Sequence, residues 1–260
     1  MSCVIGIRRE DKNEWERRVP LIPADIRGLQ ESQSLRFLVQ PSGIRVFADD
    51  EYRDAGIVLS EDLSPASIVL AVKEVPEHLI QPGRVYVFFA HVAKGQQHNM
   101  PMLRRLMELG CSLVDYEKIT DDRKRRLIFF GRHAGWAGMI ETLRAIGQRL
   151  SVTGVATPLS EVRHAYQYPD LKVAKEHLEG VGQKIARSGL SAGRRPMVFG
   201  FSGYGNVSTG AQEVLEWLKP AEIPVAGLPS AGGKVPASAA PLVKAVFREE
   251  DLVEPREPGR

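Results

Sequence analysis

Residues 196–218 read PMVFGFSGYGNVSTGAQEVLEWL, and this stretch decides the fold class of the chain. The apolar run Pro196–Phe199 predicts a short strand, the glycine-rich stretch Gly200–Gly210 predicts a turn, and Ala211–Leu218 predicts a helix. A strand that passes through a tight glycine turn into a helix is a building unit of α/β sheets. We therefore predict an α/β fold.

Small residues in this turn stand where a dinucleotide would approach the backbone. The pattern Gly203-x-Gly205-x-x-Ser208 fits the nucleotide-binding fingerprint, whose glycines allow a tight turn and close contact with a pyrophosphate. The following helix would present free N–H groups and a positive dipole end to the phosphates. Because the third position is Ser instead of Gly, a turn that binds nothing is an equal alternative. The candidate cofactor-binding residues are Gly203, Gly205, Ser208 and Gly210.

The cofactor predicted by this pattern is NAD or NADP, and the next strand bears on the choice. The fingerprint places an acid about 20 residues further on, where it holds the ribose hydroxyls. Here Glu222 precedes the expected strand Ile223–Ala226, and Lys234 follows it. A 2′-phosphate would be repelled by a carboxylate and attracted by a cation, so the sequence favours NADP weakly.

The first 130 residues alternate short apolar runs with helical stretches, which is the pattern of a largely parallel sheet wrapped by helices. The expected strands are Val4–Ile7, Arg36–Val39, Ile68–Val72, Val85–Ala90, Ser112–Asp115 and Leu127–Phe130. The expected helices are Ala24–Leu29, Asp49–Ala55 and Met102–Leu109, the last closed by Gly110 as a C-cap. One α/β domain accounts for all of them.

Beyond this domain, apolar residues recur at helical spacing from Trp136 to Leu150, and a second helix is expected over Leu171–Ser188. After Pro220 the chain is rich in Ala, Pro, Gly and Ser and shows no further clear helix–strand pair. We therefore expect two Rossmann-like domains with largely parallel sheets, the second of them incomplete. The expected order is a substrate or catalytic domain over residues 1–133, linking helices over 134–195 and a partial NAD(P)-binding domain over 196–260.

Ionisable residues follow three of the expected strands. Lys73 and Glu74 follow one strand, His91 follows the next, and Tyr116 and Glu117 follow a third. Each residue taken alone is more often a solvated side chain, but parallel strands would bring all of them to one edge of the sheet. Lys and His can move protons while a nicotinamide carries a hydride, and neighbouring carboxylates would favour their protonated forms. The pattern predicts Lys73 and His91 as acid/base groups, tuned by Glu74 and Glu117.

Two arginines are candidates to hold a substrate carboxylate. Arg18 lies in WERRVPLIP and Arg132 lies in FGRHAGWAGM. A guanidinium binds a carboxylate through two parallel hydrogen bonds. A structural ion pair is at least as probable for each arginine.

Composition excludes several other classes of protein. The 35 basic and 32 acidic residues are scattered and give a net charge of +3, which argues against nucleic-acid binding. No apolar run reaches the roughly 20 residues of a membrane span, and the amino terminus does not resemble a signal peptide. Cys3 and Cys111 lack metal-site spacing and are expected to be core thiols. We expect a cytoplasmic protein that acts on small molecules and holds no metal.

Six stretches carry a family resemblance between about Ile5 and Leu218. They read, in order, GIRREDKNEWERRVPLIP, VKEVP, FFAHVAKGQQHNM, DYEKITD, FGRHAGWAGMIETL and FSGYGNVSTGAQE. Together they resemble the lysine-forming saccharopine dehydrogenases, also called lysine-ketoglutarate reductases, and the reductase region of the aminoadipic semialdehyde synthases. More distantly, the pattern resembles alanine dehydrogenase and the nucleotide-binding part of proton-translocating transhydrogenase.

The resemblance implies roles for the residues singled out above. It implies that Arg18, Lys73 and His91 line a substrate cleft, that Lys73 and His91 are the acid/base groups, and that Glu74 and Glu117 lie near them. The implied reaction joins lysine to 2-oxoglutarate through an imine that NAD(P)H reduces to saccharopine, or runs backward.

Three questions stay open at the level of sequence. The relatives continue beyond the equivalent of Arg260, so we expect a truncated chain that needs either an oligomeric partner or a missing carboxyl-terminal segment. One alternative is a non-catalytic remnant of the family. Another is an alanine dehydrogenase, which the FGRHAGWAGM stretch disfavours because those enzymes carry Met-Ser-Glu at that place.

Overall fold

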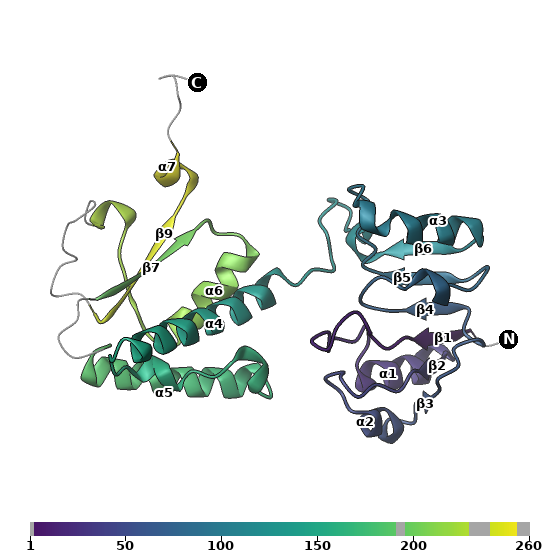
Figure 1. The fold of residues 1–260 in the computed structure, drawn as a ribbon, viewed down its shortest axis with the longest axis horizontal. Coiled ribbons are helices and arrows are strands. Elements are labelled where there is room, and N and C mark those ends of the chain that lie inside the picture. Colours follow the sequence, from purple (N-terminus) through teal and green to yellow (C-terminus); the bar gives the residue numbers. More distant parts are fainter. Residues whose placement is uncertain (1–2, 191–195, 229–239, 254–260) are drawn as a thin grey trace. The chain divides into compact units, whose positions relative to one another are not determined.

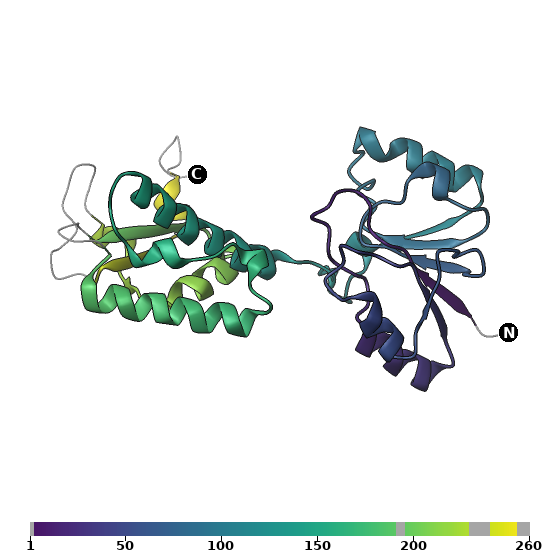
Figure 2. The ribbon, with the colours of Figure 1, turned by 60° about the horizontal axis from the view of Figure 1, so that its bottom comes forward.

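The computed structural model describes residues 3–190, 196–228 and 240–253. The chain folds into two compact units, residues 1–129 and residues 130–260. Figures 1 and 2 show the helices and strands of each unit. The two units are described separately below.

The first unit is a parallel sheet wound in the Rossmann manner (Figure 1). Its strands are β1 (Val4–Ile7), β2 (Arg36–Val39), β3 (Val58–Leu59), β4 (Ile68–Leu70), β5 (Val85–Phe88) and β6 (Ser112–Asp115). They lie in the order β3-β2-β1-β4-β5-β6, and every pair is parallel. The strand order reverses between β1 and β4. That reversal is the switch point at which open α/β sheets bind ligands, outside the carboxyl ends of the strands.

Helices cover both faces of this sheet (Figure 2). They are α1 (Pro23–Gln33), α2 (Asp49–Asp54) and α3 (Met100–Glu108). Alternate residues of a strand point to opposite faces. Ile7 packs with Ile26 and Tyr52 in the core under α1 and α2, whereas Val69 and Tyr86 pack in the core under α3. Burial on both faces explains why these strands read as continuous apolar runs.

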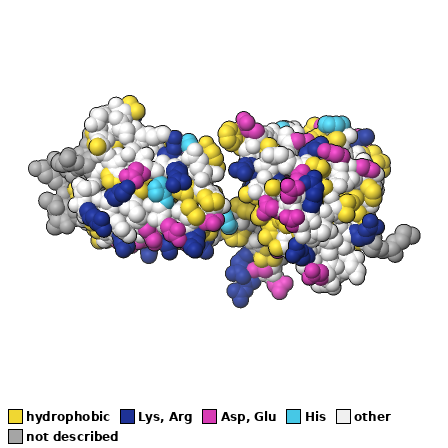
Figure 3. Space-filling model, turned by 90° about the horizontal axis from the view of Figure 1, so that it is seen from below, with side chains coloured by type: hydrophobic (Ala, Val, Ile, Leu, Met, Phe, Trp, Pro, Cys, Tyr) yellow, Lys and Arg dark blue, Asp and Glu magenta, His cyan; other side chains and the backbone are white. Residues whose placement is uncertain are grey.

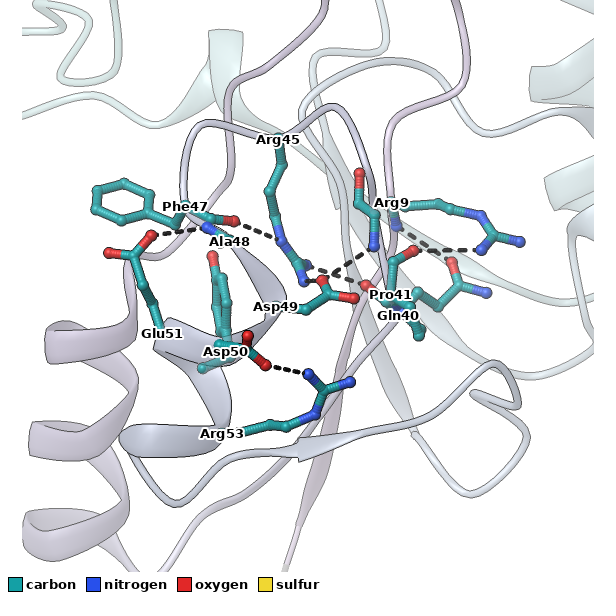
Figure 4. Close-up of polar contacts among 12 residues, drawn as sticks. Arg9, Gln40, Pro41, Arg45, Phe47, Ala48, Asp49, Asp50, Glu51 and Arg53 are labelled. Atoms are coloured by element: carbon teal, nitrogen blue, oxygen red, sulfur yellow. Dashed lines mark hydrogen bonds and ion pairs between the residues drawn. The ribbon is translucent and has the colours of Figure 1, made fainter. Parts of the chain in front are cut away.

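A buried arginine fixes the loop between β2 and α2 (Figure 4). Arg45 is 8% exposed and donates hydrogen bonds to the carbonyl oxygens of Gln40 and Phe47, both at 3.0 Å. Its guanidinium also pairs with Asp49 and lies 4.2 Å from the ring centre of Tyr52. The loop is therefore held by side-chain bonds where it has no regular secondary structure.

The second unit has its core between three helices and a small sheet, and a fourth, short helix lies outside that core. Its helices are α4 (Gly131–Val152), α5 (Leu171–Ser188), α6 (Asn206–Glu216) and α7 (Glu249–Leu252), and its strands are β7 (Met197–Ser202), β8 (Ala221–Glu222) and β9 (Leu242–Phe247). The strands are parallel and lie in the order β7-β9-β8. The core joins Leu143 of α4, Leu178 of α5, Leu215 of α6 and Leu242 of β9.

Short 3₁₀ helices complete the described elements. They are η1 (Glu77–Leu79), η2 (Gln97–Asn99), η3 (Tyr116–Lys118), η4 (Pro158–Glu161), η5 (Ala165–Gln167) and η6 (Val225–Gly227).

Most elements of the first unit match the sequence prediction. β1, β2 and β6 have the predicted bounds, and α1, α2, α3, β4 and β5 differ from them by a few residues. Gly110 follows α3 with a φ of 62°, the left-handed conformation expected of a glycine that ends a helix. The predicted strand Leu127–Phe130 is wrong, because only Arg126 forms a bridge, with Thr120, and no strand lies beyond β6 in the described sheet. The two-residue strand β3 was not predicted.

The second unit departs further from the prediction. The segment 134–195, predicted as linking helices, supplies α5 and most of α4 to the core of this unit, which begins at Phe130. The helix predicted from Ala211 begins at Asn206 instead. The strand predicted at Ile223–Ala226 is wrong, since β8 ends at Glu222 and Pro224 has no N–H for a ladder. Strand β9 was not predicted.

Helices α4 and α6 touch through glycines. A Cβ atom on Gly135 would lie 2.1 Å from the carbonyl oxygen of Val207, and one on Gly210 would lie 2.1 Å from the carbonyl oxygen of Arg132. No Cβ fits at such a distance, so the two backbones can pack this closely only with glycine at both positions. Gly138, on the same helix as Gly135, would have no neighbour within 4 Å of its Cβ.

We expect Gly135→Ala to destabilise the chain by about 1–3 kcal/mol, because the added methyl forces two helix backbones apart. Gly138→Ala is the matched control and should be neutral or stabilising by up to about 1 kcal/mol, since Ala favours a helix over Gly. Urea unfolding followed by circular dichroism measures both. Equal stability of the two variants would contradict the close contact.

Candidate active site

The parallel sheet of the first unit brings the predicted ionisable residues to one edge. Lys73 lies just beyond β4, His91 just beyond β5, and Tyr116 and Glu117 directly after β6. β4, β5 and β6 are consecutive neighbours in the sheet, next to the switch point. The spatial arrangement that the strand ends predicted is therefore present.

Lys73 shares a carboxylate with Arg18. The Lys73 Nζ atom lies 4.0 Å from Oε2 of Glu16, a residue that is only 7% exposed. Arg18 binds the same carboxylate through two hydrogen bonds, from Nε to Oε1 at 2.7 Å and from an Nη atom to Oε2 at 2.6 Å. Burial by itself would raise the pKa of Glu16, but the hydrogen bonds and charge of Arg18, with the charge of Lys73, lower it overall. Glu16 is therefore an anion at neutral pH and the counter-ion of Lys73.

His91 shares a second carboxylate with another arginine. The Nδ1 atom of His91 lies 3.8 Å from Oε2 of Glu117, and Arg126 donates to Oε1 of Glu117 at 3.1 Å. The Arg126 guanidinium also lies 5.4 Å from the ring centre of Phe89. His91 has a φ of 52°, a left-handed conformation that side-chain-bearing residues rarely adopt.

Glu74, which was expected to tune Lys73 and His91, forms its ion pair with Lys12. Its Oε1 atom binds Lys12, and its Oε2 atom is buried with no hydrogen-bond partner among the described residues. Burial would raise the pKa of Glu74, and the hydrogen bond from Lys12 together with smaller effects, including the charge of His91, lowers it overall. Burial also raises the pKa of Tyr116 to about 12, so this phenol stays protonated.

Arg132 belongs to the second unit and forms a structural ion pair. Two of its nitrogens bind the two carboxylate oxygens of Glu213 in α6, at 2.9 Å and 2.7 Å. The indole N–H of Trp136 donates to the same carboxylate at 2.7 Å. The alternative named for Arg132 is therefore the arrangement found. In the first unit, Arg18 shares a carboxylate with Lys73, and Arg126 shares one with His91.

The glycine-rich turn has the expected backbone geometry. Gly203 has a φ of 84°, and Gly205 is the N-cap of α6. The Ser208 hydroxyl donates to the carbonyl oxygen of Gly203 at 2.6 Å, which ties the first turn of α6 to the loop. Gly210 is buried against Arg132, and this helix contact by itself accounts for a glycine there.

A cavity of about 990 Å³ adjoins this turn within the second unit. Tyr204 of the turn lines one side, the apolar residues 223–226 line another, and Arg248 and Glu250 lie at its rim. The strand next to β7 is β9, and its carboxyl end carries Arg248 and Glu249. Tyr204 donates to the Glu249 carboxylate at 3.2 Å. The carboxyl end of β9 therefore lies beside the carboxyl end of β7, next to the glycine-rich turn.

Glu222 and Lys234 are the residues on which the choice between NAD and NADP was based. Glu222 ends β8, lines the cavity beside Tyr204 and pairs with the buried Lys244 at 2.8 Å, and Lys244 also pairs with Glu216. Lys234 lies outside the described residues. The preference for NADP therefore stays a prediction.

Three residues of the site were not found from the sequence. Lys12 and Glu16 lie in the loop after β1, where no periodic pattern marks a position, and Arg126 lies in the charged run DDRKRR, which reads as a solvated surface. Arg126 is recognisable only from its contact with Glu117.

The described ranges show no sign of a metal site or a membrane span. No group of three or more His, Cys, Asp or Glu side chains in those ranges could hold a metal ion, and none of the helices there is long and apolar enough to cross a membrane. On the face that Figure 3 shows, basic and acidic side chains are interspersed on each unit. That face offers no continuous basic surface to a nucleic-acid backbone.

Comparison with known proteins identifies the family. The model described as "Alanine dehydrogenase/PNT, N-terminal domain" matches residues 6–137, which is half of the chain. The chain belongs to this family. Among solved structures, an L-alanine dehydrogenase matches 93% of this chain and 60% of its own length with a TM-score of 0.58 and 19% identity, a likeness of fold.

Sequence relatives confirm the resemblance drawn from the six motifs. An alpha-aminoadipic semialdehyde synthase of Arabidopsis thaliana is 36% identical over 99% of this chain, and its mitochondrial counterpart in Bos taurus is 38% identical over 85%. A saccharopine dehydrogenase [NAD(+), L-lysine-forming] of Emericella nidulans is 29% identical over 82% of this chain and 56% of its own length. The chain spans about a quarter of the length of the two synthases, 26% and 24%.

The lowered pKa of Glu16 predicts a pH-dependent contribution to stability. A carboxylate with a lowered pKa stabilises the folded state above its ordinary value of 4.5, and this contribution is lost as the pH falls through the lowered pKa. Glu16→Gln should therefore be less stable than the wild type by about 1 kcal/mol at pH 7, because Arg18 is partly exposed and screened. The difference should shrink in urea unfolding experiments as the pH falls below 4.5 and on through the lowered pKa of Glu16. A difference that does not change with pH would contradict the assignment.

Proposed function

We propose that this chain carries the acid/base groups and part of the nicotinamide-binding site of a saccharopine dehydrogenase-like oxidoreductase. The reaction would join the ε-amine of lysine to the keto group of 2-oxoglutarate and reduce the product to saccharopine, or run in reverse. One observation supports this above all: Lys73 and His91 lie at neighbouring strand ends, each sharing a carboxylate with an arginine. The family and the names of the relatives supply the reaction class.

Proton transfer is the chemistry that these residues would perform. The amine attacks the keto carbon to give a carbinolamine, which loses water to form an imine. Lys73 and His91 would take the proton from the amine and return one to the departing hydroxyl. A nicotinamide, when bound, would supply the hydride that reduces the imine. Glu16 and Glu117 balance the charge of the two groups as protons arrive and leave.

The two arginines of the first unit would bind substrate carboxylates. Arg18 and Arg126 each already hold a carboxylate, Glu16 and Glu117, at hydrogen-bond distance. A guanidinium suits a carboxylate because its planar N–H donors match the two carboxylate oxygens. The dicarboxylate 2-oxoglutarate and the amino acid lysine would be oriented in this way.

The second unit would bind the dinucleotide. Its pyrophosphate would lie at the turn from Gly203 to the N terminus of α6, where N–H groups have no partner within the helix. The adenosine would enter the cavity beside Tyr204, whose apolar wall at residues 223–226 suits the adenine. We keep a weak preference for NADP, because Arg248 would attract a 2′-phosphate. Glu250, which lines the same cavity, would favour the unphosphorylated ribose of NAD.

Compartment and assembly enter the proposal from the sequence alone. A cytoplasmic location and an oligomeric partner are part of the proposal. The Bos taurus synthase is named as mitochondrial.

Oxidation of NADH and of NADPH by this chain, with lysine and 2-oxoglutarate present and each omitted in turn, tests the proposal. We expect turnover that needs both substrates, and comparison of the two coenzymes at equal concentration decides their preference. Alanine formation from pyruvate and ammonia without saccharopine formation would favour the alanine dehydrogenase alternative. No turnover with any pair, together with no binding of either coenzyme, would refute the proposal.

Lys73→Met and His91→Gln should each lower kcat about 10²–10⁴-fold while the far-UV circular dichroism stays unchanged, because each removes one proton-transfer group. Lys172→Met in α5 and His78→Gln in η1 remove the same side chains from exposed positions and are the controls. Rates near wild type for both Lys73→Met and His91→Gln would contradict the catalytic assignment.

Arg126→Ala should raise KM for 2-oxoglutarate about tenfold or more, because it removes a carboxylate-binding group beside His91. Arg132→Ala removes an arginine whose carboxylate partner is Glu213, so it should leave that KM within about twofold. Steady-state kinetics of the two variants decides between the arginines. A larger effect at Arg132 would restore the interpretation drawn from the sequence.

A further inference from the structure

Buried polar side chains are concentrated at the carboxyl edge of the first sheet. Those of the first unit are Arg8, Glu10, Glu16, Arg45, Asn99 and Asp115. Burial of such groups is costly unless they are hydrogen bonded. Glu10 and Asn99 have no part in the proposed chemistry, yet they are 6% and 4% exposed. Both bind backbone atoms at the point where an acid/base residue leaves its strand.

The Glu10 carboxylate accepts the backbone N–H groups that follow β4. The ladder between β1 and β4 continues only as far as the bond from Arg8 N–H to the carbonyl oxygen of Leu70, at 2.9 Å. β1 has ended there, and beyond β4 the N–H of Ala71 binds the carbonyl oxygen of Val87 in β5 at 3.0 Å. The next two N–H groups, of Val72 and Lys73, have no partner in β1. The Glu10 carboxylate accepts both, from Val72 at 2.7 Å and from Lys73 at 3.0 Å. Two oxygens on two consecutive N–H groups fix the peptide planes from which the Lys73 side chain departs.

Asn99 holds the residue before His91. Its Nδ2 atom donates to the carbonyl oxygen of Ala90 at 2.8 Å, and the buried Asp115 accepts a longer bond from Ala90 N–H at 3.4 Å. The next residue, His91, has a φ of 52°. A left-handed conformation at a residue with a side chain is strained and persists only where neighbouring groups enforce it. The bond from Asn99 is such a constraint.

We propose that Glu10 and Asn99 are positioning residues, which act on the reaction by fixing the backbones of Lys73 and His91. This inference rests on the proposed function, since it concerns the same two acid/base groups. Neither residue needs to touch a substrate. A displacement of about 1 Å in a reacting group costs up to about 100-fold in rate, so loss of either anchor should appear in kcat.

Glu10→Gln and Asn99→Ala test the proposal. The amide of Gln keeps one acceptor but turns an NH₂ group toward the second N–H, and Ala leaves the Ala90 carbonyl without its donor. We expect kcat to fall at least tenfold in each variant, with KM for the dinucleotide within about twofold because the second unit binds it. Glu10→Asp retains the carboxylate and should recover part of the rate.

Tyr52→Phe is the matched control for a loss of stability. It removes a single hydrogen bond from a buried side chain to the backbone of the same unit, to the carbonyl oxygen of Leu21 at 3.2 Å. We expect it to lower the melting temperature without lowering kcat at a temperature where all variants are folded. If Glu10→Gln and Asn99→Ala also keep kcat within twofold of wild type there, the proposal is wrong.

Double variants separate positioning from a general structural effect. If Glu10 acts through Lys73, Glu10→Gln should reduce the residual kcat of Lys73→Met by less than about twofold, because the group it positions is gone. Asn99→Ala should likewise add little to His91→Gln. Fully multiplicative losses in both pairs would show independent effects and overturn the proposal.

Hydrogen exchange gives a readout that does not need turnover. Peptides that cover residues 68–76 should exchange faster in Glu10→Gln than in the wild type, and those that cover residues 21–27 should not. A wild type that neither turns over nor binds either coenzyme would refute the proposed function, whereas unchanged exchange of residues 68–76 would refute the anchoring by Glu10. The two failures are therefore distinguishable.

Discussion

The parallel pairing of β1, β4, β5 and β6 is the constraint on which the candidate site depends. Parallel strands end at the same edge, so one residue beyond each strand is enough to assemble a site from parts of the chain that are far apart in sequence. The same geometry has a cost: strands of unequal length leave N–H and C=O groups unpaired at that edge. Glu10 and Asn99 supply the missing partners. The side chains that pair the free backbone groups at the end of the sheet therefore also hold the backbone next to Lys73 and His91.

Charge at this edge is arranged in two similar groups. In each group one carboxylate lies between an arginine and an acid/base residue: Glu16 between Arg18 and Lys73, and Glu117 between Arg126 and His91. Removing one member would leave the others as partly buried, unbalanced charges, which is costly.

The sequence predicts well what depends on local pattern. Apolar runs of four residues predicted the bounds of β1, β2 and β6, and the positions that follow the runs of β4, β5 and β6 predicted where Lys73, His91 and Glu117 lie. It could not predict what depends on partners distant in sequence. The sequence does not distinguish the roles of Arg126 and Arg132. The two differ in the carboxylate that each binds, which is Glu117 for Arg126 and Glu213 for Arg132. Strand β9 lies between β7 and β8, an order that no local pattern reports.

The glycine-rich turn shows why a fingerprint of letters is ambiguous. Gly203 is required by a left-handed backbone, whereas Gly210 is required by contact with α4, and both count equally in the sequence pattern. Only the first requirement bears on a phosphate, since it shapes the loop that would approach one. The second is met by any pair of closely packed helices. A glycine fingerprint is therefore evidence for phosphate binding only through those glycines that helix packing does not already require. Here these are Gly203 and Gly205.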